Sequence, residues 1–282
     1  VSGTDLILYV SGTPSTRFCS GTTLAVAVAC NFDQYDRPTA GSINFCLTQV
    51  QLNSAGTASA SVIQDNVDVN LGGILTFENS ASLIQTNENP AINKGDIIYK
   101  RNTSDMLRYS YTYWSSPVYS ATQTLFALSP ATLADKYFSW NIDSQSWLLH
   151  RDGGIAMEKA KGYIVRAPQT FPISGTAASY SATFNGVPNN GLITITTQGS
   201  TTEDKWNLIG NPYPSALIAD SFLNQTINPD IEGTIYLWTN FTGVSSIPNA
   251  NGTYSYTNND YAVYNFSGGT ATAPALGSTV EP

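Results

Sequence analysis

Short apolar runs separated by polar turns recur along the whole chain. In the first 50 residues they lie at residues 5–10 (DLILYV), 24–30 (LAVAVAC) and 42–46 (SINFC), with Gly, Ser, Thr and Pro between them. Alternating or short apolar runs bounded by turn residues are typical of β-strands. No segment between residues 53 and 100 keeps a helical period for more than about two turns. The pattern therefore predicts an all-β protein.

Between residues 51 and 104 the runs follow each other at a regular, short spacing. They read ASVIQ, NVDVNL, GGILTFE, ASLIQ and GDIIYK, with Asn, Gly and Ser between them. Regular spacing of this kind predicts strands stacked as a short β-solenoid or a meander. The edge of a β-sandwich is an alternative for the same pattern. We therefore expect a separate strand-stacked unit over residues 51–104, after a first β segment over residues 1–50.

Residues 105–282 contain an apparent internal repeat. Aromatic-bearing segments recur in the same order at an offset of about 97–98 residues. The matching segments are 109–111 with 206–208, 116–117 with 213–214, 138–140 with 236–238, and 163–165 with 261–263. This repeat predicts a duplicated β-sandwich after the solenoid-like part.

Two short helices and one irregular stretch are expected in this second part. Residues 130–136 and 216–224 follow Ser129 and Ser215, whose hydroxyls are plausible N-caps. In the stretch NPYP at residues 211–214, each proline fixes φ and removes a backbone donor, which forces the chain out of a sheet.

Charge is scarce: charged residues make up 11% of the 282 residues, and the formal net charge is −8. This share is less than half of the roughly 25% found in soluble domains. Ser, Thr and Asn replace the charged residues, a composition typical of extracellular or cell-surface β-proteins. The negative charge and the lack of a basic cluster argue against nucleic acid as a partner. No apolar run is long enough to span a membrane as a helix.

The three cysteines, Cys19, Cys30 and Cys46, lie close to the start of the chain. An odd number allows one internal disulfide at most, and the spacing matches no zinc site, which needs four ligands in a chain with a single histidine. The chain starts at Val1 without a secretion signal, so we expect a mature chain or a fragment.

The stretch from residue 1 to residue 48 resembles a segment of the leishmanolysin family of zinc peptidases. The matching stretches are TDLILYVSG, CSGTTLAVAVAC and DQYDRPTAGSINFC. In that family an HExxH helix follows this segment, but no HExxH occurs here, and Leu47 stands where the family usually has proline. The resemblance therefore implies an inactive fragment of such a peptidase as one alternative for this chain.

Residues 55–282 resemble secreted surface and adhesin-like proteins of Bacteroidota that are exported by the type IX system, best known from flavobacteria and their gliding machinery. The motifs YWSSPV and WNLIGNPYPSA carry the resemblance, together with GGILTFENSASLIQTNE and EKAKGYIVRAP. Such proteins usually continue into a final GQGFF-type strand and a C-terminal sorting domain. The resemblance implies a secreted, non-catalytic role, and a chain that is truncated or processed after Pro282.

Catalytic chemistry has few candidate residues. His150 is the only imidazole, and its setting, LLHRDGG, is that of a surface turn. Hydrolysis needs a base near neutrality, a nucleophile or a metal, and no carboxylate pair stands out for glycosidase chemistry. We therefore expect no enzymatic activity and no cofactor.

Calcium is the one metal for which the sequence offers oxygen ligands. They lie in two stretches, residues 65–68 (DNVD) and 258–260 (NND), and extracellular β-proteins often bind calcium at loops. Neither stretch matches an EF-hand or a glycine-rich nonapeptide loop, so solvated turns are the alternative.

Aromatic side chains are the best ligand-binding candidates, and Trp114, Trp140 and Trp238 are first among them. The other candidates are Tyr113, Trp147 and Trp206. A flat apolar ring suits the C–H face of a sugar, whereas aromatics that alternate along a strand commonly fill a sandwich core.

We therefore predict a non-catalytic extracellular protein for adhesion, matrix or filament assembly. Its partners would be other surface or matrix proteins, or further copies of itself. A carbohydrate-binding module is the main alternative.

Overall fold

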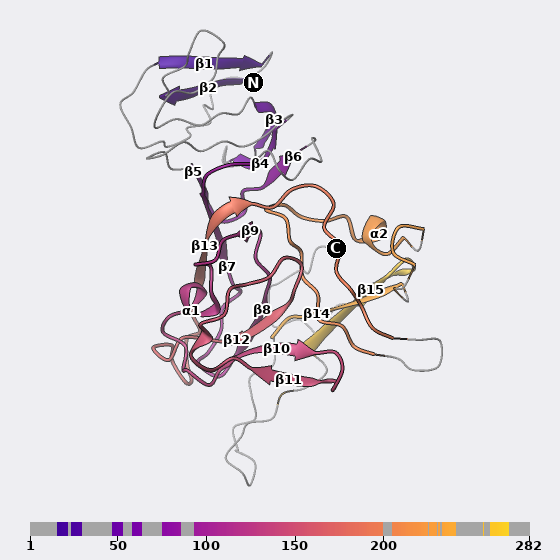
Figure 1. Ribbon diagram of the computed structural model, residues 1–282. Helices are drawn as coiled ribbons and strands as arrows, with labels where there is room; N and C mark the ends of the chain where they lie inside the picture. The colour runs from indigo at the N-terminus through magenta and orange to yellow at the C-terminus, as the bar shows by residue number, and fades with distance from the viewer. Residues whose placement is uncertain are drawn as a thin grey trace.

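In the computed structural model, residues 16–21, 24–29, 47–52, 58–63, 75–85, 93–199, 205–224, 226–229, 231, 233–240, 256 and 260–270 are described. Strands in several sheets dominate these residues, and the two α-helices that they contain are four residues long each (Figure 1). The fold is all-β, as the sequence pattern predicts. Among these residues, no helix is long and apolar enough to cross a membrane.

The N-terminal strands form small sheets of their own. β1 (Thr16–Gly21) pairs antiparallel with β2 (Leu24–Ala29), which coincides with the strand predicted at residues 24–30. The strands predicted at residues 5–10 and 42–46 lie outside the described residues. β3 (Leu47–Leu52) pairs antiparallel with β4 (Ala58–Ile63), and β6 (Leu83–Gln85) completes their sheet.

Two parallel strand pairs in this region share one sequence spacing. Ser61 of β4 lies opposite Leu83 of β6, and Leu75 of β5 (Leu75–Phe77) lies opposite Ile97 of β7 (Ile97–Asn102). The number of residues between paired positions is therefore the same in the β4–β6 pair as in the β5–β7 pair. Parallel pairs at a constant step are typical of a solenoid, but these two pairs lie in different sheets and β4 also pairs antiparallel with β3. The choice between a solenoid and a meander therefore stays a prediction.

The body of the protein contains two four-stranded sheets. One has the order β5-β7-β13-β9, and the other, in which all pairs are antiparallel, has the order β11-β10-β12-β8. The remaining strands of these sheets are β8 (Tyr111–Trp114), β9 (Val118–Tyr119), β10 (Tyr137–Asn141), β11 (Ser146–Leu149), β12 (Tyr163–Arg166) and β13 (Ser181–Pro188).

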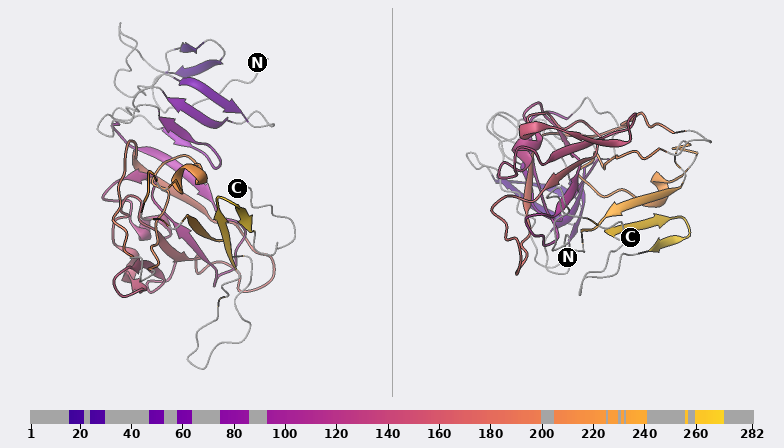
Figure 2. Two further views of the ribbon diagram at one scale, coloured as in Figure 1. Left: turned by 90° about the vertical axis from the view of Figure 1, so that its right-hand side faces the viewer. Right: turned by 90° about the horizontal axis from the view of Figure 1, so that it is seen from below.

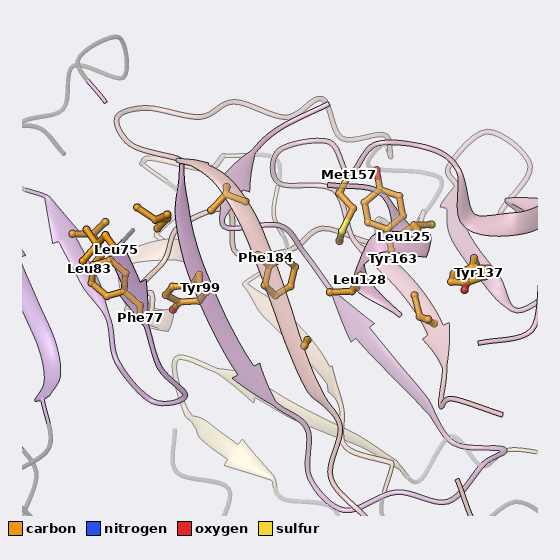
Figure 3. Packing of buried hydrophobic residues seen from close by; sticks show 14 residues of the cluster. Leu75, Phe77, Leu83, Tyr99, Leu125, Leu128, Tyr137, Met157, Tyr163 and Phe184 are labelled. Carbon is orange, nitrogen blue, oxygen red and sulfur yellow. The ribbon is translucent and has the colours of Figure 1, made fainter. Parts of the chain in front are cut away.

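These two sheets face each other across the hydrophobic core, as in a β-sandwich. Ala182 and Phe184 of β13 are buried, while the alternating Ser181 and Thr183 are exposed, so this strand buries a single face. Figure 3 shows Phe184 between two groups of core side chains. One group comes from β5, β6 and β7, and the other includes Leu125, Met157 and Tyr163.

A third sheet, in the order β14-β15-β16, packs against the other face of the β8 sheet. It consists of β14 (Thr234–Trp238), β15 (Tyr261–Asn265) and β16 (Gly268–Thr270), all antiparallel. Figure 2 shows it in yellow and orange at one side of the body. The strand β8 is therefore packed on both faces, whereas β11 of the same sheet is exposed along its length.

The structure does not confirm a duplicated sandwich. The strand pair β10–β12 and its counterpart β14–β15 are both antiparallel, but Phe138 faces Ile164 whereas Tyr236 faces Val263, which shifts the register by one position. The counterpart of β8, near Trp206, forms no strand and makes only an isolated bridge from Ile209 to Lys161. The repeat remains a prediction.

The helix predictions are partly wrong. Residues 130–136 form turns, and the helix α1 (Leu125–Leu128) comes before them, because the Thr124 hydroxyl accepts the Ala127 N–H as its N-cap. Ser129 instead ends this helix, and its hydroxyl bonds to that of Thr132. The second helix, α2 (Ala219–Phe222), lies within the predicted range but lacks a side-chain cap.

Phe184→Ala should destabilise the fold by about 3–5 kcal/mol, because it leaves a cavity where the two sheets meet. Urea unfolding of the purified chain measures this loss. Thr183→Ala, on the exposed face of the same strand, is the matched control and should leave the free energy of unfolding nearly unchanged. Equal losses for the two variants would contradict the assignment of the core face.

Candidate functional site

Neighbouring side chains of β8 point to opposite faces of its sheet. Trp114 lies opposite the buried Tyr163 and meets Phe184 of the facing sheet edge-on, with ring centroids 5.9 Å apart. Tyr113 points the other way, toward the β14–β15 sheet. Its ring stacks on Trp238 at 6.0 Å and an interplanar angle of 14°.

Tyr113 is the centre of a group of aromatic side chains on this outer face, which we call the aromatic cluster. Edge-to-face contacts join Tyr113 to Trp147 and Tyr261, Trp147 to Trp140, Trp238 to Tyr261, and Trp206 to Tyr236. Edge-to-face pairs are favourable because the positive ring edge meets the negative ring face. The cluster comprises Tyr113, Trp140, Trp147, Trp206, Tyr236, Trp238 and Tyr261.

Hydrogen bonds join polar atoms of the cluster across the two sheets. The hydroxyls of Tyr113 and Tyr261 bond to each other, and burial together with this bond raises the pKa of Tyr113 well above its ordinary value. The Trp238 indole N–H donates to the backbone oxygen of Tyr111 at 2.9 Å. These bonds attach the third sheet to β8 at defined positions.

The backbone of Trp206 is held by side chains of the β10–β11 hairpin. Its N–H donates to the Gln145 Oε1 at 2.8 Å, and its carbonyl accepts the Trp140 indole N–H at 2.8 Å. The Gln145 amide nitrogen also donates to this carbonyl, at 3.2 Å. Gln145 adopts a left-handed φ of 47°, which is unfavourable for a residue with a side chain.

The three tryptophans predicted as ligand-binding residues do not form one exposed platform. Trp114 faces the core, Trp238 stacks on Tyr113, and the Trp140 nitrogen is used to hold Trp206. All three are of intermediate burial. Each makes contacts that stabilise the fold, and ligand binding by these three residues stays a prediction.

The exposed members of the cluster are others: Trp206 is 60% exposed, Tyr236 45% and Trp147 42%. Trp206 begins the motif WNLIGNPYPSA, so the sequence marks its position. Tyr236 belongs only to the aromatic repeat, and no motif in the sequence marks it as a binding residue. Strand alternation alone could not place Tyr236, because the ring that it meets, Trp206, comes from a distant segment outside the strand.

The two motifs YWSSPV and WNLIGNPYPSA lie against each other. A Cβ on Gly210 would overlap the Cβ of Ser115, so only glycine allows this approach. Gly162 meets Leu208 in the same manner. The Gly162 N–H donates to the Leu208 carbonyl, and the Gly210 N–H donates to that of Ala160.

One buried amide joins both motifs. The Asn189 Nδ2 donates to the carbonyls of Ser116 at 3.2 Å and Pro212 at 2.9 Å. Within the NPYP stretch, the Asn211 side chain accepts the N–H of Tyr213 and donates to the carbonyl of Ser215. The stretch lies outside every strand, as its prolines predict.

A cleft of about 500 Å³ opens where these motifs meet β7 and β13. Its lining includes Tyr99, Arg101, Trp114, Ser115, Asn211 and Tyr213. Arg101 donates to the Tyr99 hydroxyl and to the carbonyls of Ala81, Glu78 and Lys100, so it holds the loop between β5 and β6. Burial lowers the pKa of Arg101 and raises that of Tyr99 to about 12.

His150 is not the exposed turn residue that its sequence context indicates. It is partly buried at the end of β11, and its Nε2 lies 2.8 Å from the hydroxyl of Ser139, which is 1% exposed. Burial, and then the Lys161 ammonium, lower the pKa of His150 below its ordinary value. The burial of Ser139 makes this pair a structural contact.

Metal ligands do not gather within the described ranges, where no group of three or more His, Cys, Asp or Glu side chains could hold an ion. Of the calcium candidates, Asp65, Asp68 and Asn258 lie outside the described residues. Asp260 is buried, and its backbone carbonyl accepts both the N–H and the hydroxyl of Thr239. The side chains of Cys19, Cys30 and Cys46 are also outside the described ones, so a disulfide among them stays a prediction.

Gly210→Ala should destabilise the fold by about 1–3 kcal/mol, because the new methyl group overlaps Ser115. Chemical denaturation measures the change. Gly154→Ala is the matched control, since its Cβ would meet nothing within 4 Å. Adding Ser115→Gly to Gly210→Ala should recover part of the loss, and a loss that does not respond to this second change would contradict direct contact between the motifs.

The free energy of unfolding should decrease as the pH falls from about 7.5 to about 5.5. The pKa of His150 is lowered in the folded state, so the unfolded state binds the proton more readily below about pH 6.5 and folding loses stability there. Denaturation midpoints at several pH values measure this slope. His150→Gln removes the chain's only imidazole and should flatten it; an unchanged slope would contradict the assignment.

A comparison with protein families matches residues 44–281 to the family described as "Domain of unknown function (DUF8693)". No curated protein matches the chain, and no solved structure matches it. The family match covers well over half of the sequence, from just before β3 to beyond β16. The chain therefore belongs to this family of domains of unknown function.

Proposed function

We propose that this chain is a non-catalytic extracellular surface protein that acts in adhesion, or in the assembly of a matrix or filament. The observation that carries the proposal is an apolar surface on the outside of the aromatic cluster. Trp147, Leu149, Trp206 and Tyr236 make up this surface, which we call the outer aromatic surface, and each is between 38% and 60% exposed. Gathered exposed apolar side chains are typical of surfaces that contact a partner.

Contacts within the cluster make these residues one surface. Trp147 and Leu149 share a face of β11, because their partners on β10 are Trp140 and Phe138. Trp147 packs on Trp140 at 5.0 Å, Trp140 bonds to the backbone of Trp206, and Trp206 packs on Tyr236 at 4.9 Å.

The edge of the sheet supports the same role. β11 is the terminal strand in the order β11-β10-β12-β8, and its sequence SWLL contains neither a charge nor a proline. Charges and prolines are the usual means by which sheet edges avoid pairing with another chain. We therefore propose another surface or matrix protein, or a second copy of this chain, as the partner.

The chemistry of the whole chain supports an extracellular setting. Lys and Arg are absent after Lys205, so the third sheet contains no basic residue. The matched family range includes the motifs that resemble surface proteins exported by the type IX system. We propose secretion by such a route, with the protein placed at the cell surface.

Adhesion can be measured with beads that carry the full chain, passed under flow over glass, collagen and chitin surfaces. We expect retention above that of albumin-coated beads on at least one surface. Trp147→Ser/Leu149→Ser should lower retention by at least about fivefold, because both side chains leave the outer aromatic surface.

Ile173→Ser is the control, since Ile173 is 56% exposed and is not part of the outer aromatic surface. Near-UV circular dichroism establishes that each variant keeps its tertiary packing. Retention no higher than that of albumin on every surface, or equal retention of the double variant, would overturn the proposal.

A further inference from the structure

We propose that Trp206 and Tyr236 form a binding site for neutral glycans, with one hexopyranose ring resting on the indole. This inference rests on the proposed adhesive function, for which it names a ligand class and a site. The two rings meet at 4.9 Å with an interplanar angle of 77°. They form a corner of two aromatic planes, with Trp206 60% and Tyr236 45% exposed.

The corner has the shape that a pyranose needs. An indole face is flat and electron-rich, so it attracts the slightly positive C–H groups on one side of a sugar ring. Tyr236 stands nearly perpendicular to that face and can bound the sugar at its edge. Its hydroxyl supplies a donor and an acceptor.

Hydrogen bonds hold the backbone of Trp206 although its side chain is exposed. Its peptide groups make three hydrogen bonds, with Trp140 and with both ends of the Gln145 amide. Gln145 keeps the left-handed conformation in which it makes these bonds, at the cost of backbone strain. A backbone that is held in advance loses little freedom on binding, which favours affinity.

Polar groups next to the corner match sugar hydroxyls. The Asn207 side chain bonds to the N–H and carbonyl of Gln198, and the Gln198 amide donates to Asp143 at 2.7 Å. These hydrogen bonds lie at the surface, and a carboxylate and amides are the usual partners of hydroxyls. The formal charges of Asp143 and Lys205 are opposite, so the corner offers no net attraction for an acidic glycan.

The other aromatic residues are less suited to this role. Trp114 faces the core, and Trp238 is covered by Tyr113 and Tyr261. Trp147 is exposed on one side, but its ring is already packed by Trp140 and Tyr113. The Trp206–Tyr236 pair is therefore the place in the cluster where two exposed rings meet.

Isothermal titration of the full chain tests the proposal with cellohexaose, laminarihexaose, xylohexaose and mannohexaose. We expect at least one of them to bind and to quench tryptophan fluorescence. Trp206→Ala and Tyr236→Ala should each weaken binding by at least about tenfold. Phe126→Ala is the matched control, because Phe126 is a 50% exposed aromatic residue on α1.

Gln145→Gly tests the positioning of Trp206 separately. Glycine relieves the left-handed strain, so the variant should fold with undiminished stability. Its glycan affinity should nevertheless fall by about threefold to tenfold, because two hydrogen bonds to Trp206 are lost. An affinity equal to that of the unmodified chain would overturn the role of Gln145 in the site.

Two comparison ligands delimit the ligand class. Equal affinity for hexagalacturonate would overturn the preference for neutral glycans. The second comparison ligand is a proline-rich peptide. The glycan site would be overturned if none of the four neutral hexasaccharides bound, or if only this peptide bound at the corner. Bead retention that persists in Trp206→Ala, together with absent glycan binding, would overturn the glycan site and leave the adhesive function standing.

Discussion

The strand β8 packs on both of its faces, and the arrangement of the body depends on this constraint. Trp114 contributes to the packing against the β13 sheet, while Tyr113 carries the packing of the β14–β15 sheet. A strand that packs on both faces cannot shift by one position without moving each aromatic ring to the wrong side. The register of β8 against β12 therefore determines where the third sheet attaches and where the exposed rings emerge.

Backbone hydrogen bonds hold the loop that carries WNLIGNPYPSA against the body. Glycines, which have no side chain, let the two segments approach closely. Gly210 and Gly162 allow close approach, and the Asn189 amide joins this loop to the YWSSPV segment. The most specific motifs of the sequence thus have a structural explanation. Their functional consequence is indirect, because the loop also positions Trp206 beside the β10–β11 hairpin.

Much of the secondary structure could be read from the chain, whereas the pairing of the two rings at the site could not. The strands around Leu75, Ile97 and Tyr163 follow from short apolar runs between turn residues. The exposed corner involves Trp206, outside any strand, and Tyr236, which lies far from it in sequence. Local patterns carry no information on such a pairing, and the three tryptophans singled out from the sequence instead make contacts within the fold.

The sequence by itself determined the all-β class, the low charge and the irregular NPYP stretch, because strand periodicity and proline geometry are local properties. Only the tertiary structure decided the parallel pairing at a constant sequence step, the bond between His150 and Ser139, and which rings face water. Alternation shows that a strand has two faces. It does not show which partner covers each face, since that depends on contacts between segments distant in the chain.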